Sequence, residues 1–227
     1  MKHRQSFSYA RKLAAIALEI GAIKLNPETP FTWASGYRMP VYNDNRLLLG
    51  NASHRLLVAR GFRAILDQER IAIDAVAGTA TAGIPHATTL ADLLKTPLVY
   101  VRAEPKAHGM RNQVEGILKK NQNLVVVEDL ISTGASALKT VEALRRAGAA
   151  IRHCLCIFNY GFETSEALFQ QANCRLHSLL SFSVLLQYAA ETRTVTQEQA
   201  ALLRRWRQNP FGWGDQNGFP KTNRSTH

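Results

Sequence analysis

The residues best suited to chemistry in this sequence lie in one segment, Leu124 to Ala137, which reads LVVVEDLISTGASA. An apolar run there ends in two acids and continues through a Ser-Thr-Gly turn toward a helix. At such strand-to-helix junctions, unpaired N–H groups and the positive end of the helix dipole bind phosphate. The hydroxyls of Ser132, Thr133 and Ser136 add further donors. Gly134 lets the backbone approach the anion, so the segment predicts a phosphate site.

The two acids of this segment, Glu128 and Asp129, need a different partner, because carboxylates repel anions. Adjacent acids at a strand end suit two vicinal hydroxyls or a hydrated divalent cation. A ribose phosphate offers hydroxyls and a phosphate together and so satisfies both halves of the segment. The alternative is that Asp129 only caps the next helix and that the Ser/Thr cluster is an ordinary turn. Neither a GxxxxGK[ST] loop nor a GxGxxG loop is present.

A second loop of small residues, GTATAG from Gly78 to Gly83, follows another apolar run. Gly78 and Thr79 lie where this run turns toward a helix, so the loop is a candidate second cradle for an anion. Taken alone it is ambiguous, because a Gly/Ala/Thr loop is as often simple strand-to-helix packing.

The hydrophobic pattern supplies a scaffold for both loops. Apolar residues recur every three or four positions in six segments, which predicts helices over 7–22, 53–67, 84–94, 136–147, 164–172 and 197–206. Short continuous apolar runs predict strands covered on both faces over 72–77, 98–101, 124–127, 154–158 and 176–180. The alternation of strands and helices favours an α/β fold with a mostly parallel sheet flanked by helices.

The two ends of the chain do not follow this alternation. Prolines and glycines divide residues 26–40 into turns and short extended pieces, so residues 1–50 are expected to form a helix and a small cap on the sheet. Residues 51–208 are then the α/β core. From residue 209 onward, glycines, prolines and few aliphatic residues predict an irregular C-terminal tail, residues 209–227.

The composition of the 227 residues limits the class of partner. A formal net charge of +11 favours polyanions: nucleic acid, an acidic membrane surface or a heavily phosphorylated small molecule. No window approaches the roughly 18 uninterrupted apolar residues of a membrane-spanning helix, so we expect no membrane partner. Three cysteines cannot form a disulfide framework, and Cys154 and Cys156 lie in an apolar run. We therefore expect buried thiols and a reducing, cytoplasmic location.

Three separated motifs along the chain resemble a known family. The strand, acid pair and glycine loop, VVVEDLISTGAS, resemble the phosphoribosyl pyrophosphate (PRPP) motif of type I phosphoribosyltransferases. Tyr100–Gly109, YVRAEPKAHG, is similar to the mobile catalytic loop of the orotate phosphoribosyltransferases of that family. Phe31–Arg46, FTWASGYRMPVYNDNR, is similar to their N-terminal hood. The resemblance covers residues 15 to 213 approximately and implies the type I phosphoribosyltransferase fold with a small N-terminal hood.

The resemblance implies an enzyme that transfers the phosphoribosyl group of PRPP to orotate, giving orotidine 5′-monophosphate and pyrophosphate in pyrimidine biosynthesis. It implies a Mg²⁺ cofactor held mainly through the substrate, with Asp129 as a candidate ligand. It also implies a cytoplasmic homodimer in which loop 102–120 completes the neighbouring subunit's site. Catalytic roles fall on Arg102, Lys106 and His108, which would stabilise or protonate the leaving pyrophosphate. The alternative for this loop is a solvated basic hairpin.

The same resemblance assigns the contacts with PRPP to the two glycine loops: Gly78, Thr79, Glu128, Asp129, Leu130, Ile131, Ser132, Thr133, Gly134, Ala135 and Ser136. By position, Ser132 and Tyr42 line the base pocket. Arg46 is a candidate for binding the orotate carboxylate. Arg46 paired with Asp44 at the surface is an equally open alternative.

The chain also departs from the pattern of bacterial family members. Lysines of that pattern are replaced by alanine at three positions, Ala34, Ala82 and Ala103. An arginine that binds the orotate carboxylate is missing from the segment Asn159–Phe162. The available replacements for these cations are Arg38 and Arg46.

Two other functions therefore stay open. One is a phosphoribosyltransferase for another base, such as a purine, with the same donor site and a different pocket. The other is a non-catalytic regulator that senses PRPP while binding nucleic acid. The cations of the catalytic loop and the short segment before the sheet domain disfavour the regulator and a nucleic-acid partner.

Overall fold

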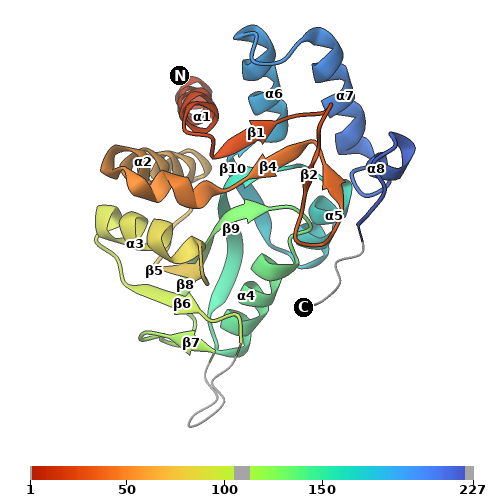
Figure 1. Cartoon of the computed structure of the whole chain (residues 1–227). Coiled ribbons are helices and arrows are strands. Elements are labelled where there is room, and N and C mark those ends of the chain that lie inside the picture. Colours follow the sequence, from red (N-terminus) through yellow and green to blue (C-terminus); the bar gives the residue numbers. More distant parts are fainter. Residues whose placement is uncertain (1, 105–112, 223–227) are drawn as a thin grey trace.

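The computed structural model describes residues 2–104 and 113–222, and its centre is a six-stranded sheet (Figure 1). In spatial order the strands are β10 (Arg175–Ser181), β9 (Ala150–Asn159), β8 (Asn123–Ile131), β5 (Ala75–Thr79), β6 (Leu98–Val101) and β7 (Val114–Glu115). All neighbours pair in parallel except β6 and β7, which are antiparallel. The expected α/β fold with a mostly parallel sheet is confirmed.

Helices cover both faces of this sheet. One face packs against α2 (Ala52–Glu69) and α3 (Gly83–Leu94), with α1 (Lys2–Glu19) beside α2, and the other packs against α4 (Ala135–Arg146) and α5 (Glu163–Gln171). Val125 and Val127 of β8 belong to the first core, whereas Leu124 and Val126 belong to the second. Because both faces of β8 are buried, its sequence is apolar without alternation.

Several boundaries differ from the sequence-based expectation. Helix α1 spans Lys2–Glu19 and not 7–22, and strands β8 and β9 extend beyond 124–127 and 154–158. The strand expected over 72–77 begins only at Ala75, because Asp74 makes hydrogen bonds to the start of β8. Its backbone N–H donates to the Asn123 carbonyl, and its carboxylate accepts from the Asn123 N–H, both at 2.8 Å. Helix α6 (Phe182–Glu191) was not expected at all. It follows β10 without a loop, with Ser181 as its N-cap, so strand and helix form one apolar run in the sequence.

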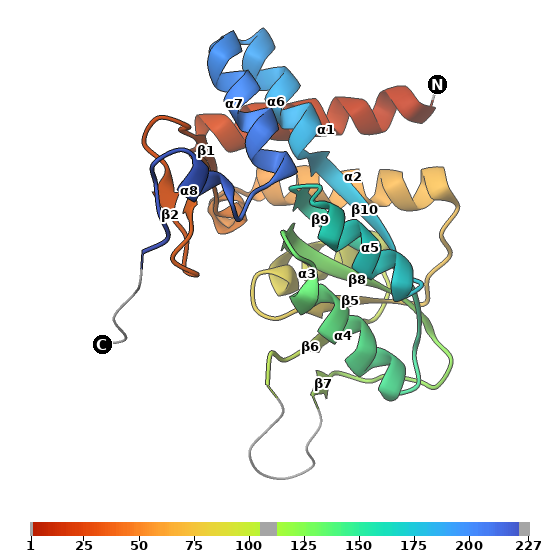
Figure 2. The ribbon, with the colours of Figure 1, turned by 90° about the vertical axis from the view of Figure 1, so that its right-hand side faces the viewer.

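Residues 23–50, called the hood from here on, form a small layer apart from the central sheet (Figure 2). β1 (Ile23–Leu25) pairs with β4 (Val41–Asn43), and β2 (Phe31–Thr32) pairs with β3 (Arg38–Met39) in a hairpin. A 3₁₀ helix, η1 (Asn45–Gly50), leads from the hood into α2.

Helix α7 (Gln197–Gln208) contacts both the hood and the core through Trp206. The Trp206 ring is fully buried, lies 5.4 to 5.6 Å from the rings of Tyr160, Phe162 and Phe182, and its Nε1–H donates to Met39 Sδ at 3.2 Å. The tail expected to be irregular contains a short helix, α8 (Trp213–Gln216), and Trp213 is buried. The described tail therefore packs against the protein around Trp213.

Cys154, Cys156 and Cys174 are free and buried, as expected for the first two. All three belong to the core under α4 and α5. No helix in the described part of the chain combines the length and apolarity needed to cross a lipid bilayer.

Candidate active site at the carboxyl ends of the strands

The acid pair Glu128–Asp129 lies within the last four residues of β8, at the carboxyl end of the parallel strands. Glu128 is 6% exposed, and its Oε1 accepts a hydrogen bond from the Asp129 N–H at 3.0 Å. Burial raises the pKa of the Glu128 carboxyl, and the neighbouring Asp129 carboxyl raises it further. Asp129 is only half-buried. The pair therefore combines an acid that favours its neutral form with a more accessible carboxyl, a set suited to hydroxyl groups.

Glu128→Gln is expected to stabilise the ligand-free protein against unfolding, and more so at about pH 8 than at about pH 5.5. Folded Glu128 keeps a proton that the unfolded chain releases above its ordinary pKa of 4.5. Wild-type stability should therefore fall as pH rises from that value toward the raised pKa, by at most about 1.4 kcal/mol per pH unit. Urea unfolding at several pH values would show a flatter profile for the variant. The same slope in both proteins would contradict this prediction.

The loop after β8 has the geometry of an anion-binding helix start. Gly134 is the N-cap of α4 with φ +83°, no side chain caps this helix, and its first turn holds no acid. A Cβ at Gly134 would lie 2.9 Å from Cε2 of Phe169, so the position requires glycine for both conformation and space. Since the cap is Gly134, the alternative in which Asp129 caps this helix is wrong.

The polar side chains of this loop are available to a ligand. Ser132 and Thr133 are half-buried and Ser136 is exposed. Among the residues that the structure describes, none of their hydroxyls makes a hydrogen bond within the protein. Leu130, Ile131 and Ala135 complete the segment, with Ile131 buried in the core. Free hydroxyls beside unpaired helix N–H groups match the chemistry of a phosphate site.

The second small-residue loop lies beside the first because β5 and β8 are neighbours, with Gly78 opposite Val127. Thr79 is buried, and its hydroxyl lies close enough to the Glu128 carboxyl to lower that group's pKa, although no hydrogen bond of good geometry joins them. A Cβ at Gly83 would overlap the Val127 carbonyl oxygen, and one at Gly78 would lie 2.9 Å from Cα of Ile84. The glycines therefore let α3 pack directly on the strands, and Thr79 leaves a buried hydroxyl next to the acid pair.

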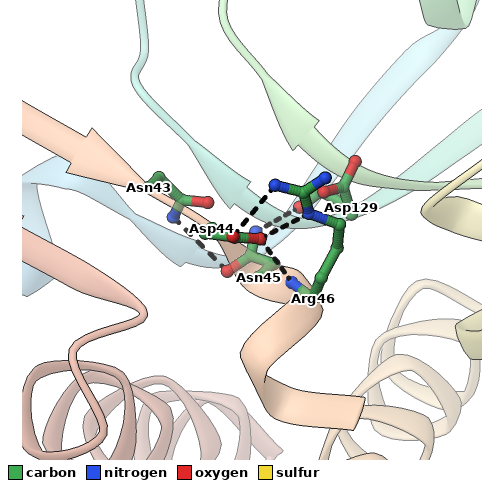
Figure 3. A network of polar contacts seen from close by, with 5 residues as sticks. All are labelled: Asn43, Asp44, Asn45, Arg46 and Asp129. Atoms are coloured by element: carbon green, nitrogen blue, oxygen red, sulfur yellow. Dashed lines mark hydrogen bonds and ion pairs between the residues drawn. The ribbon is translucent and has the colours of Figure 1, made fainter.

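The hood contacts the acid pair through a polar network at the start of η1 (Figure 3). Asn45 is 1% exposed, and its Nδ2–H donates to the backbone carbonyl of Asp129 at 2.7 Å. Its Oδ1 accepts from Nδ2 of Asn43 at 3.3 Å. Asn45 was not predicted as a site residue, because its partner is 84 positions away and a polar Asn-Asp-Asn-Arg run looks like an exposed turn.

If the site binds PRPP, as the sequence resemblance implies, Asn45→Ala is expected to raise the KM for PRPP by about tenfold, since it leaves the partly buried Asp129 carbonyl without its donor, a loss of about 1–3 kcal/mol. Steady-state kinetics and thermal unfolding would measure the effect on the site and on the fold. Asn26→Ala is the matched control: Asn26 accepts from the Thr29 N–H in an exposed turn of the hood, and its loss should leave this KM unchanged. Equal effects of the two variants would contradict the assignment.

Arg46 and Tyr42 of the predicted base pocket also lie in the hood. The Arg46 guanidinium makes two hydrogen bonds with the Asp44 carboxylate, Nε to Oδ1 at 2.6 Å and Nη2 to Oδ2 at 2.9 Å. The structure thus shows the alternative in which Arg46 pairs with Asp44 at the surface. This pair raises the pKa of Arg46, and the nearby Tyr42 and Asp129 raise it further. The Tyr42 ring lies 5.7 Å from that of Phe31.

The other positions that bear on the base pocket are occupied by structural contacts. Arg38 donates to the Pro30 carbonyl at 3.1 Å, which holds it within the hood. In the segment where the family pattern has arginine, Tyr160 is buried and stacks on Phe162 at 5.3 Å. That segment therefore supplies core packing, and Arg46 is the better placed of the two replacement cations.

The predicted catalytic residues are only partly within the described chain. Arg102 follows β6, its side chain is 43% exposed, and its Nη1 lies 3.6 Å from Oε1 of Glu115. Two hydrogen bonds of 2.9 Å with Gln113, one from the Arg102 N–H and one to the Arg102 carbonyl, close the base of the loop. Lys106 and His108 lie outside the described residues, so their roles stay predictions.

The carboxylates at the carboxyl ends of the strands fit a cation that is bound mainly by a substrate. Within residues 2–104 and 113–222, no group of three or more His, Cys, Asp or Glu side chains converges as metal ligands. Asp129 offers one accessible carboxylate, and Mg²⁺ commonly completes such a set with substrate phosphates and water.

Comparison with known proteins identifies the family of this chain. Residues 51–177 match the family model described as "Phosphoribosyl transferase domain". An orotate phosphoribosyltransferase of Listeria innocua is 46% identical over 207 residues, which cover 91% of this chain and 99% of that protein. One from Cytophaga hutchinsonii is 44% identical over 206 residues, with coverages of 91% and 99%.

Solved structures give the same result. The crystal structure of orotate phosphoribosyltransferase from Aeropyrum pernix superposes with a TM-score of 0.70 at 34% sequence identity, covering 81% of this chain and 99% of that one. The family model, the relatives and the fold point to the same family. The chain therefore belongs to the phosphoribosyltransferase family and, within it, to the orotate phosphoribosyltransferases.

Proposed function

We propose that this chain transfers the phosphoribosyl group of PRPP to orotate, releasing pyrophosphate and giving orotidine 5′-monophosphate for pyrimidine biosynthesis. The observation that carries this proposal is the Glu128–Asp129 pair near the carboxyl end of β8, five residues before the uncapped N-terminus of α4, where the hood contacts β8 through Asn45. The names of the relatives support orotate over other bases.

In this proposal the residues of β8 and α4 bind the ribose 5-phosphate part of PRPP. The α4 N–H groups and the hydroxyls of Ser132, Thr133 and Ser136 donate to the 5-phosphate. Asp129 and Glu128 bind the two ribose hydroxyls, which holds the anomeric carbon in a fixed orientation. Gly78 and Thr79 bind the pyrophosphate, with the buried Thr79 hydroxyl as one donor.

The loop residues act on the leaving group. As the bond between the anomeric carbon and the pyrophosphate oxygen lengthens, negative charge grows on the pyrophosphate, and cations that meet it there lower the barrier. Arg102 would exchange Glu115 for a phosphate, while Lys106 supplies a point charge and His108 a proton or hydrogen bond. When bound, Mg²⁺ would neutralise further charge on the pyrophosphate, with Asp129 as its protein ligand.

The base side of the site is assigned to the hood. Orotate is a flat anion, so it suits the Tyr42 ring, the Ser132 hydroxyl and one cation. Arg46 is this cation in the proposal: its side chain is 67% exposed and its pair with Asp44 is local, so it can turn to the orotate carboxylate without disturbing the fold.

We further propose a homodimer in which loop 102–120 of one subunit completes the site of the other, in the cytoplasm, where the three free thiols would persist. Mixing an inactive Lys106 variant with an inactive Asp129 variant tests this arrangement. If the loop acts on the neighbouring subunit, mixed dimers contain one site with both residues intact and activity returns. Activity that stays absent after subunit exchange would contradict it.

The direct test is orotate consumption by the purified chain with PRPP, with and without Mg²⁺. Orotidine 5′-monophosphate should form only with all three present, and excess adenine, guanine or hypoxanthine should not compete. Purine turnover with orotate ignored would identify a transferase for another base. Absence of any turnover, together with duplex DNA binding that weakens with salt, would identify a regulator.

A further inference from the structure

The last described residues of the chain, 218–222, lie along the β2–β3 hairpin of the hood, and we call them the C-terminal strap. The Gly36 carbonyl at the hairpin turn accepts two hydrogen bonds from Thr222, from its N–H at 3.0 Å and from its Oγ1 at 3.2 Å. The Lys221 Nζ lies 4.4 Å from the centre of the Tyr37 ring. Residues 186 positions apart are thus joined at the tip of the hairpin.

The other end of the strap is fixed to the core. The Phe219 N–H donates to the Gly214 carbonyl at 2.8 Å, and the Phe219 ring stacks on buried Trp213 at 5.9 Å with an interplanar angle of 16°. The Arg38 guanidinium of β3 lies 6.0 Å from the same Phe219 ring. A segment anchored on Trp213 and bonded to Gly36 holds the hairpin at a set distance from the core.

The hairpin needs such support because it is short. β2 and β3 share two residue pairs, and a two-stranded hairpin alone is at best marginally stable in water. At its tip Gly36 has φ +84°, and a Cβ there would overlap the Thr222 carbonyl oxygen. The two backbones therefore pack as closely as glycine permits.

The hairpin also contacts strand β4, which carries the Tyr42 ring assigned above to the base. The Phe31 ring of β2 contacts Tyr42, and the Trp33 Nε1–H donates to the Val41 carbonyl at 2.8 Å. Strands β2 and β4 are thus coupled, and Figure 2 shows β2 and α8 together on the hood side of the sheet. Both lie outside residues 51–177, the segment that the family model matches.

We propose that the C-terminal strap positions the β2–β3 hairpin for binding of a flat anionic base, with Thr222 and Phe219 as positioning residues. This inference rests on the proposed function, since the base it concerns is orotate. The strap acts through Gly36 and Arg38 on the hairpin, and the hairpin acts through Phe31 on Tyr42. Among the described residues, no hydrogen bond or ring contact joins residues 218–222 to the PRPP-binding loops of β5 and β8, so the effect of the strap should fall mainly on the base.

The test compares the full chain with a chain that ends at Asn217 and with Thr222→Pro, which lacks the N–H and hydroxyl donors to Gly36. We expect both variants to raise the KM for orotate by about tenfold, which corresponds to the loss of one to two hydrogen bonds. The KM for PRPP should change by less than about twofold. Amide hydrogen exchange of residues 31–38 should accelerate by about tenfold or more in both.

Two point variants serve as controls. Thr222→Ser keeps both donors and should restore the values of the full chain. Lys221→Gln removes the charge but keeps the hydrogen bonds, and it should leave both constants unchanged. If Lys221→Gln alone reproduces the full loss, charge accounts for the effect and the positioning role is wrong.

Unchanged orotate KM in the truncated chain and in Thr222→Pro would overturn the inference, whether or not the exchange of the hairpin accelerates. An equal rise in both KM values would also overturn it, because it would show a general loss of structure. Absence of orotate turnover in the full chain, by contrast, is the result that rejects the proposed function itself.

Discussion

Asp129→Asn is expected to lower kcat/KM for PRPP by about 100-fold, which corresponds to about 3 kcal/mol of lost charge-assisted contacts with the ribose hydroxyls and the bound cation. Asparagine has nearly the same shape, and the backbone carbonyl of residue 129 would still accept from Asn45. The hood should therefore stay in place, and the loss should come from the side-chain charge. Steady-state kinetics with varied PRPP at saturating orotate would measure it.

The matched control for this variant is Asp74→Asn. Asp74 lies at the amino end of the same pair of strands, where its carboxylate accepts from the Asn123 N–H, far along β8 from the acid pair. Its replacement should affect stability and leave kcat/KM within about threefold. A loss in Asp129→Asn as small as that of the control would show that the acid pair does not meet the substrate.

Lys106→Ala is expected to lower kcat by about 100-fold to 1,000-fold, the size of effect seen when one group that stabilises developing charge is removed. The KM for PRPP should change far less, because this cation is assigned to the transition state and not to the bound donor. Lys106 lies outside the described residues, but the paired Arg102 and Gln113 at the loop base bring the chain out from the carboxyl end of β6.

Lys95→Ala is the control for charge in general. Lys95 is exposed at the C-cap of α3, in the turn before β6, at the amino end of the sheet. Its removal should leave kcat unchanged. If Lys106→Ala left the maximal rate untouched, or if both variants lost the same activity, the assignment of the loop would be wrong.

The parts of this protein that sequence reasoning could predict are those encoded locally. β8 is apolar on both faces because Val125 and Val126 enter different cores, and the acid pair and Gly134 follow within a few residues. Strand, acids and helix start are therefore visible in one segment. Helix α6 was missed for the opposite reason, since no turn separates it from β10.

Long-range contacts left no such local signal. The hydrogen bond from Asn45 to the Asp129 carbonyl and that from Thr222 to the Gly36 carbonyl each join segments that are separate in the sequence. A buried asparagine cannot be told from an exposed one by residue type, and a proline- and glycine-rich tail reads as irregular whether or not it packs. The choice between an orotate carboxylate and Asp44 for Arg46 was open for the same reason.

The three buried cysteines beneath α4 and α5 can report how often these two helices move away from the sheet. Burial raises the pKa of each thiol, so the reactive thiolate is scarce while the helices cover the sheet. A thiol-labelling reagent would then modify them only during excursions that lift the layer, and the labelling rate would report how often this happens. Slower labelling in the presence of PRPP would show that a ligand bound at the start of α4 reduces the opening of the helix along its whole length.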